Sequence, residues 1–458
     1  MRTTTLAIKL SLLPLLLTGA CLESSPREGS GSAGPGPAAG GKSWDVADGG
    51  YEEEFDRSHA RDPSRFGGEG EMGMAAGGGD GGGDGGGGGP ADADSAIGEP
   101  GMDGPDPRQG GGLEGGEVND NELWDEYLSY VRDSQALVDS DPSIHWLDVS
   151  RRYFIQVTDS NGITVPNAQV RVSEGQRLLA DGLTLSDGRL PFHPGAHGAA
   201  DSDGPFDVEV TLGDLTATTT VDLNTLTTDA VLDGPAPRDP LYLDVAFIID
   251  STGSMGEEIA RIQQTILDIA AQLKGSEFEP ELRMGFVEYR DRGDEFVTHT
   301  VNLTSDIESF ENAVAQLQAG GGGDFPEDMN AALERTMNRL EWREGRALRL
   351  TFVVADAPPH HYDDAQYSYD DAMLDAHAQG IKVFPVASGG SDGTAEFVLR
   401  QLAQFTMGRF VFITEGGGSS AGSGGSDYDV NEADFRVERL DSLIVRLVSE
   451  EMAAWTGR

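Results

Sequence analysis

Between residues 240 and 458 the chain alternates short apolar runs with segments in which apolar residues recur at helical spacing. The run at 243–249 is broken only by Asp244 and is rich in β-branched and aromatic residues, which predicts a strand buried on both faces of a parallel sheet. Apolar residues then repeat at helical spacing over 259–273. Further strands are expected at 282–289, 296–303, 348–355, 381–387 and 409–413, and further helices near 310–317, after Pro326, and at 369–379, 394–407 and 440–455. This alternation predicts an α/β domain over 240–458 on a doubly wound, mainly parallel sheet, with 296–303 as an antiparallel edge strand.

From 148 to 234 the apolar period changes to two. Strands are expected at 154–157, 168–172 and 206–212, and the turn signals at 159–162 and 186–188 favour a small antiparallel all-β sandwich. Residues 157–175 and 183–192 resemble carboxypeptidase-regulatory-like or transthyretin-like modules, which are usually non-catalytic spacers or binding modules. His193 and His197 lie in a loop of this domain. They are expected at the surface rather than as metal ligands, because no other donor is spaced to join them.

The segments before this domain have a different composition. Residues 21–118 are dominated by Gly, Pro, Ala, Ser and Asp and contain too few apolar residues to offset chain entropy, so a disordered tether is expected there. Residues 119–147 form a helical segment, in which Trp124, Tyr127, Leu128 and Val131 share one face that is expected to pack against the protein.

Residues 1–20 have the features of a secretory signal peptide: basic Arg2 and Lys9, an apolar stretch at 10–17 and small residues at 18–20. The run LTGAC at 17–21 resembles a bacterial lipobox, although Thr18 stands where leucine is most usual. The resemblance implies cleavage before Cys21, which would carry lipid and anchor the chain in the cell envelope. Leu22, rather than aspartate, implies the outer membrane. The alternative is an ordinary signal peptide followed by a chance cysteine. Cys21 is the only cysteine, so a disulfide within the chain is excluded.

The net charge of −47 makes a general nucleic-acid binder untenable, because such a surface does not neutralise phosphates. It favours solubility and attracts cations. The sequence also shows no Ser-His-Asp or Cys-His arrangement at plausible spacing, no HExxH motif and no phosphate loop. A function without catalysis is therefore expected, with a metallohydrolase as a remote alternative.

The candidate chemistry lies where the run at 243–249 ends. Asp250, Thr252 and Ser254 are alternate residues between a buried strand and a helix, and ligands of open α/β sheets bind at that edge. Three such oxygens can converge on one hard cation such as Mg2+, which leaves coordination positions for water. The alternative is a helix cap, since Ser254 and Glu257 have the spacing of a capping box.

The motif DSTGSM resembles the metal-ion-dependent adhesion site that opens a von Willebrand factor type A domain. Residues 320–328, GGGGDFPED, resemble the glycine-rich loop of one branch of that family, and the strand at 350–355 ends in Asp356. The resemblance covers about half of the chain, from 240 to 458. It implies Asp250, Thr252 and Ser254 as direct ligands, and Asp356 as the holder of a metal-bound water. Family sites often supply a threonine from the loop. Here two interpretations of Asp324 stay open: it takes this role, directly or through water, or it caps a helix ahead of Pro326.

The resemblance implies a membrane-anchored, metal-dependent protein-binding or adhesion module. One divalent cation is expected, Mg2+ first, with Ca2+ or Mn2+ as alternatives. The expected partner is a protein that offers an acidic side chain to the ion. An assembly subunit of an envelope complex is the main rival. His360 and His361, close to Asp363 and Asp364, are expected to form a polar loop on the ligand-binding rim rather than a separate transition-metal site.

Overall fold

The computed structural model describes residues 113–141, 144–238, 240–323, 326–362, 364–389, 391–414, 428 and 437–458. Several predictions fall outside these residues: the signal peptide, lipidation at Cys21, the tether up to residue 112 and a role for Asp324. Within the described ranges, no helix is long and apolar enough to cross a membrane.

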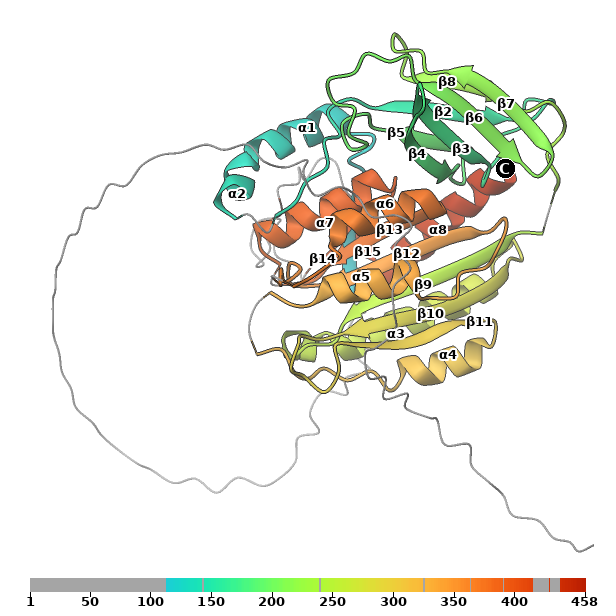
Figure 1. Ribbon diagram of the computed structural model, residues 1–458. Coiled ribbons are helices and arrows are strands. Elements are labelled where there is room, and N and C mark those ends of the chain that lie inside the picture. The colour runs from blue at the N-terminus through green and yellow to red at the C-terminus, as the bar shows by residue number, and fades with distance from the viewer. Residues whose placement is uncertain are drawn as a thin grey trace, which may run out of the picture. The chain divides into compact units, whose positions relative to one another are not determined.

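A mixed eight-stranded sheet forms the centre of the α/β domain in the described part of the chain, with the order β11-β10-β9-β12-β13-β14-β1-β15 (Figure 1). The strands are β1 (Glu114–Val118), β9 (Tyr242–Asp250), β10 (Glu281–Tyr289), β11 (Thr298–Thr304), β12 (Leu348–Ala355), β13 (Ile381–Ala387), β14 (Phe410–Thr414) and β15 (Glu438–Arg439). Strands β10, β9, β12, β13 and β14 are mutually parallel, whereas β11 is antiparallel to β10. The predicted α/β sheet and its antiparallel edge strand are confirmed.

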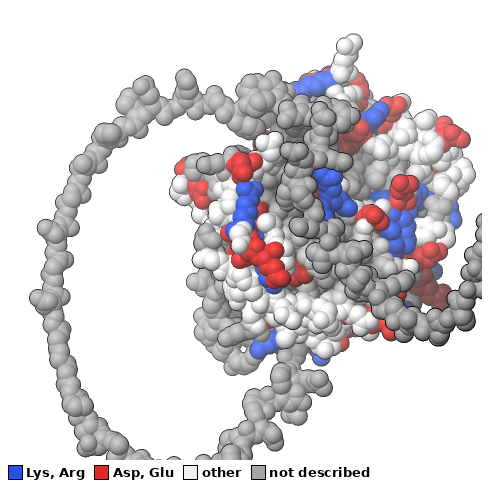
Figure 2. Space-filling view, turned by 60° about the horizontal axis from the view of Figure 1, so that its bottom comes forward, with Lys and Arg blue, Asp and Glu red and all other residues white. Residues whose placement is uncertain are grey.

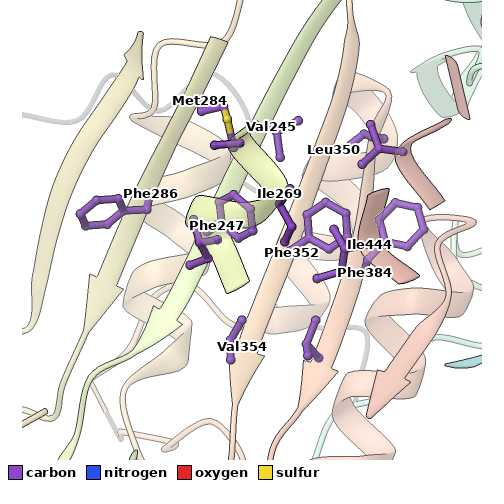
Figure 3. Packing of buried hydrophobic residues seen from close by; sticks show 14 of the residues in the cluster. Val245, Phe247, Ile269, Met284, Phe286, Leu350, Phe352, Val354, Phe384 and Ile444 are labelled. Atoms are coloured by element: carbon purple, nitrogen blue, oxygen red, sulfur yellow. The ribbon is translucent and has the colours of Figure 1, made fainter. Parts of the chain in front are cut away.

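Helices cover both faces of this sheet because its central strands are apolar on both sides. The helices of this domain are α1 (Trp124–Asp133), α2 (Gln135–Ser140), α3 (Ile259–Lys274), α4 (Ile307–Val314), α5 (Met329–Asn338), α6 (Tyr369–Gln379), α7 (Gly393–Phe405) and α8 (Leu440–Thr456). One core lies beneath α3, α4 and α8, where Phe352 stacks between Phe247 and Phe384 with ring centroids 5.7 and 5.2 Å apart (Figure 3). A second core lies beneath α5, α6 and α7.

The predicted boundary of the tether at residue 118 was wrong, because β1 is part of the main sheet. It pairs with β14 at five positions and with the start of β15. A Cβ atom on Gly115 would lie 2.9 Å from the Phe412 carbonyl oxygen and 3.2 Å from Leu440 Cδ1. The glycines that suggested disorder are therefore what allows this strand to lie close to α8.

The helical segment that follows also belongs to the α/β domain. Tyr127 is fully buried in the second core, and the buried Asp120 and Arg400 form a two-pronged ion pair of 2.5 and 3.0 Å. The expected packing face is confirmed for Tyr127, Trp124 and Val131, whereas Leu128 is not part of this cluster. Residues 113–149 and 240–458 thus build one domain, and the β domain is inserted between them. The predicted linear succession of separate segments was wrong in this respect.

The inserted β domain has two small sheets within the described residues, in the orders β5-β2-β8 and β4-β3-β6-β7. The strands are β2 (Tyr153–Thr158), β3 (Gln169–Glu174), β4 (Arg177–Leu183), β5 (Arg189–Phe192), β6 (Asp207–Leu212), β7 (Leu215–Thr220) and β8 (Thr227–Val231). One hydrophobic cluster is shared by both sheets. The prediction of an entirely antiparallel arrangement was wrong, because β2 and β8 are parallel neighbours.

Two local predictions also need correction. Helix α5 does not begin at Pro326, because Asp328 is its cap and accepts a hydrogen bond from the Ala331 amide at 3.1 Å. The expectation of surface histidines in the β domain was wrong for His193, which is fully buried against α1 and α7. His193 lies in a loop, where no apolar periodicity is available to predict its contact with the other domain.

Candidate metal-binding site

The oxygen-bearing side chains of the DxTxS motif converge at the end of β9. Asp250 is the last residue of that strand and, like Thr252, is fully buried. Asp250 Oδ1 accepts hydrogen bonds from the Thr252 amide at 2.9 Å and from the Thr252 hydroxyl at 2.6 Å. The Thr252 and Ser254 hydroxyl oxygens lie 3.0 Å apart. One carboxylate and two hydroxyls are therefore held in a continuous group of oxygens.

Asp356 joins this group from the neighbouring strand. Strand β12 ends at Ala355 and pairs in parallel with β9, so Asp356 follows at the same edge of the sheet as Asp250. Among the described residues, Asp250 Oδ2 and Asp356 Oδ1 are buried without a hydrogen-bond partner. Burial, followed by the proximity of Asp356, raises the pKa of Asp250, and burial raises the pKa of Asp356. The two carboxylates are thus poorly neutralised by the protein itself.

The alternative interpretation of Ser254 as a helix cap was wrong. Residues Gly253–Glu257 form a 3-10 turn, and the cap position of α3 is Glu258. The Ser254 hydroxyl oxygen instead lies 3.0 Å from that of Thr252, and Ser254 partly offsets the rise in the pKa of Asp356. The position of the Ser254 side chain therefore follows from its contact with the Thr252 hydroxyl and not from capping of a helix.

The glycine-rich loop packs directly on the motif. The Gly320 amide donates to the Ser251 carbonyl at 2.9 Å, and the Gly253 amide donates to the Gly321 carbonyl at 3.1 Å. Gly322 has a φ of 68°, and a Cβ atom there would lie 2.9 Å from Thr252 Cβ. Glycine therefore allows the loop to approach the Thr252 side chain. Asp324, in the same loop, is outside the described residues.

Glu327 is a site residue that the sequence interpretation missed. It is 4% exposed, its Oε2 has no hydrogen-bond partner within the described ranges, and its Oε1 lies 2.8 Å from a Cβ built on Gly322. Burial, followed by the charges of Asp250 and Asp291, raises the pKa of Glu327 to about 8. Its backbone is fixed by a hydrogen bond from the His360 amide at 2.6 Å. The quoted run GGGGDFPED contained Glu327, but the resemblance directed attention to the position of Asp324.

Two further carboxylates lie in the turn after β10. Asp294 accepts hydrogen bonds from the Gly322 amide at 2.9 Å and from the Asp291 amide at 3.1 Å. Asp291 accepts a hydrogen bond from the Tyr362 hydroxyl. Since β10 is the parallel neighbour of β9, this turn lies at the same edge of the sheet. The proximity of this charged turn to Asp250 depends on the strand order.

The histidines of the 360–364 loop do not form a metal cluster of their own. The His360 ring stacks on Tyr362 at 4.0 Å, the His361 ring meets that of His145 edge-on at 5.6 Å, and Asp364 pairs with Arg292 at 2.6 Å. Asp363 is not among the described residues. A search of the described positions finds no group of three or more His, Cys, Asp or Glu side chains placed to hold a metal.

The group at the end of β9 is of a different kind, since it combines carboxylates with hydroxyls. The donor set fits a small hard cation: every donor is an oxygen, and two buried carboxylate oxygens have no partner in the described structure. Asp250, Thr252 and Ser254 are the residues that would hold such an ion, with Asp356 and Glu327 beside them. The ion would supply positive charge near Glu327, whose pKa is raised by burial and then by the charges of Asp250, Asp291, Asp356 and Asp294.

Fold and site together define an α/β domain that presents its binding groups at the carboxyl edge of a parallel sheet. Residues 244–419 form a von Willebrand factor type A domain, a kind of domain that generally mediates protein–protein interaction.

Relatives share this domain rather than the whole chain. The chain is 36% identical over 171 residues to von Willebrand factor A domain-containing protein 7 of Rattus norvegicus, a match covering 32% of this chain and 18% of that protein. It is 28% identical over 144 residues to Alpha-protein kinase vwkA of Dictyostelium discoideum, covering 31% and 22% of the two chains. The chain thus spans about a fifth of the length of these relatives. Among solved structures, proximal thread matrix protein 1 from the mussel byssus matches with 12% identity and a TM-score of 0.29, covering 36% of this chain and 40% of that one.

Proposed function

We propose that this chain is a protein-binding module of the bacterial cell envelope whose partner binding depends on one divalent cation held by Asp250, Thr252 and Ser254. The observation that carries the proposal is the pair of buried, unpartnered carboxylate oxygens on Asp250 and Asp356, counted among the described residues. Mg2+ is the first candidate, and Mn2+ or Ca2+ can take similar oxygen ligands. Asp324 is retained as a candidate ligand.

The protein groups act by holding the ion rather than by turning over a substrate. Thr252 and Ser254 are neutral, so Asp250 supplies the one charged direct ligand of the motif. An incoming acidic side chain of the partner can then complete the coordination, with Asp356 orienting a bound water. The ion supplies the attraction between two acidic surfaces. On this basis we propose a binding protein and not an enzyme.

Direct measurement of cation binding tests this proposal. Calorimetric titration of the full chain with Mn2+ or Mg2+ is expected to show one site, and Asp250→Ala is expected to abolish it while the circular dichroism spectrum stays unchanged. Glu308→Ala, at an exposed position of α4, is the matched control and should bind as the parent does. Unchanged affinity in Asp250→Ala would overturn the assignment.

The location is also a proposal. The LTGAC run at 17–21 supports lipid attachment at Cys21 and the outer membrane as the destination. Nucleic acid remains an unsuitable partner. On the face shown in Figure 2, the acidic and basic side chains of described residues lie in adjacent small groups rather than in a broad basic surface.

An assembly subunit of an envelope complex is the second candidate. One observation favours this second function: β4 of the inserted β domain packs on α6. A surface formed by two domains together is suited to a permanently bound partner. A fixed partner that remains bound after chelation would favour this second function over reversible adhesion.

A further inference from the structure

Three histidines and two aromatic residues form a dry contact between the inserted β domain and the α/β domain, which we name the histidine joint. The loop after β5 contributes His193 and His197, while α1, α6 and α7 contribute Trp124, His377 and Phe405. The His193 ring stacks on Trp124 at 6.1 Å and on Phe405 at 5.5 Å. The His197 ring lies 5.5 Å from that of His377, which lies 5.8 Å from Phe405.

Burial favours the neutral form of the His193 and His377 imidazoles, and the nearby carbonyls of Arg151, Val149 and Pro191 only partly offset this. His193 Nδ1 lies 3.3 Å from the Arg151 carbonyl, and its Nε2 is buried with no partner among the described atoms. His377 Nε2 donates to the Pro191 carbonyl at 2.8 Å. His193 is 0% and His377 5% exposed. A second proton on either ring would therefore add an unpaired charge in a water-poor site.

The charged groups around the joint do not offer a counter-charge. From the chain entering β2, the Arg152 guanidinium lies 3.8 Å over the Trp124 ring, and Arg151 donates to the carbonyls of Ala200 and Ser202. From the same segment, Asp148 lies beside Gly195 and accepts a hydrogen bond from the Ser150 amide at 3.0 Å.

On α1, Asp125 and Glu126 are exposed, and the acids named next on α6, α7 and β4 have other partners. On α6, Asp375 bonds Tyr367 and Asn338; on α7, Glu396 bonds Arg400, which also binds Asp120; on β4, Asp181 bonds Arg171. Burial, followed by the positive charge of Arg152 and the nearby His377, lowers the pKa of His193 to about 3, and burial lowers the pKa of His377.

We infer that the histidine joint is an acid-sensitive hinge: protonation of His193 and His377 separates the loop after β5 from α6 and α7. The contacts of Asn167, which lies beside Gly380 at the C-terminal end of α6, supply the pivot. There, Asn167 Oδ1 accepts hydrogen bonds from the Ala347 amide at 2.8 Å and from the Arg349 guanidinium at 3.3 Å, and neither contact involves a group that titrates near neutral pH.

The direction of the effect follows from proton linkage. Histidine in water has a pKa of about 6.5, so the separated state binds protons below that pH while the closed joint does not. The closed state therefore loses stability as pH falls from 6.5. Between pH 7.5 and 5.5 the opening equilibrium should rise about tenfold for each of the two histidines, or about a hundredfold for both.

A nearby histidine responds in the opposite direction. His145 Nδ1 lies 2.9 Å from Asp370 Oδ1, and this hydrogen bond raises the pKa of His145. Acid thus strengthens the contact between residues 144–149 and α6. The inserted β domain should move while the 113–149 segment stays on the α/β domain.

Spin labels placed on the full chain test the inference. In a Cys21→Ser background, Thr218→Cys on the exposed face of β7 and Gln264→Cys on the exposed face of α3 report the distance between the two domains. The measurement is made in chelator so that the metal site does not contribute. The distance distribution is expected to be narrow at pH 7.5 and to gain a second population below pH 6.

Two variants and a control separate titration from general acid unfolding. His193→Phe keeps a stacked ring and His377→Gln keeps a donor, and each should reduce the acid response about tenfold. His299→Gln, on β11 and far from the joint, should respond as the parent does. A distance distribution that does not change down to pH 4.5, or an acid response that survives in the double variant, overturns the inference.

Discussion

At the scale of residues, Glu327 makes the clearest link between pH and cation binding. Its pKa of about 8 reflects burial and the surrounding charges of Asp250 and Asp291. A cation that replaces this proton must compete with it, so cation affinity should fall by about tenfold for each pH unit below 8. Mn2+ titrations at pH 8, 7 and 6 measure this slope directly.

Removing the charge of Glu327 measures how much this residue contributes to the pH dependence of cation affinity. Glu327→Gln should weaken Mn2+ binding at pH 8 and leave a shallower pH dependence, set by Asp250 and Asp356. Glu295→Gln is the matched control, since the Glu295 side chain is 84% exposed and lies in the neighbouring turn. Equal slopes in parent and Glu327→Gln would remove Glu327 from the site.

The Asp120–Arg400 pair supports a second prediction at this scale. Both side chains are buried, and Arg400 also bonds Glu396 at 3.1 Å and lies over the Tyr130 ring at 3.9 Å. Arg400→Ala leaves two acids in a low-dielectric site and should cost about 3–5 kcal/mol in urea unfolding. Arg171→Ala breaks the partly exposed pair with Asp181 and should cost less than about 1 kcal/mol. Similar losses in the two variants would contradict this account.

At the scale of elements, β1 yields a prediction about domain boundaries. A chain beginning at residue 113 retains β1, whereas one beginning at 119 loses the buried side chains of Leu113 and Val118. Burial of two such side chains contributes about 3 kcal/mol or more. The shorter chain should therefore unfold at a lower urea concentration, while the longer one should match the full chain. Equal midpoints would show that β1 is dispensable.

Most elements of the α/β domain could be predicted from the sequence because each of them has a local signal. The apolar run at 243–249 ends at Asp250 in both the sequence and the structure, and the predicted helix 369–379 matches α6. The strand β1 could not be predicted in this way. Its residues EGGEV lack an apolar pattern, and their strand conformation comes from partners 292 to 300 positions away, from the pairing of Val118 with Phe410 to that of Glu114 with Thr414.

The residues of the candidate site could likewise be predicted where they carry a local sequence signal, but not where their proximity depends on strand order. Asp250, Thr252 and Ser254 are close in sequence, and Asp356 follows a recognisable strand. Glu327, Asp291 and Asp294 approach Asp250 only because β10 and β12 flank β9. Residues that become neighbours only through the order of strands in the sheet have no characteristic spacing in the sequence.

At the scale of the whole molecule, the lipid anchor proposed at Cys21 gives a prediction about location. Cys21→Ser should move the protein from the membrane fraction to the soluble fraction, because the proposed lipid is then absent. Immunoblotting of fractionated cells measures the change, with Ser24→Ala as a control that keeps the cysteine. Continued membrane association of Cys21→Ser would place the anchor elsewhere.

The last prediction concerns the partner. A chain of net charge −47 repels an acidic partner at long range, and the cation reverses that repulsion only at contact. Salt screens the long-range repulsion, so binding should survive moderate ionic strength, whereas chelator should end it and Mg2+ or Mn2+ should restore it. Replacing the partner's acidic side chain with the corresponding amide should weaken binding sharply. With a candidate partner immobilised and the cation titrated, surface plasmon resonance measures this dependence. An affinity that is indifferent to the cation would make the ion structural, and the adhesion proposal would then fail while the protein-binding role of the domain would stand.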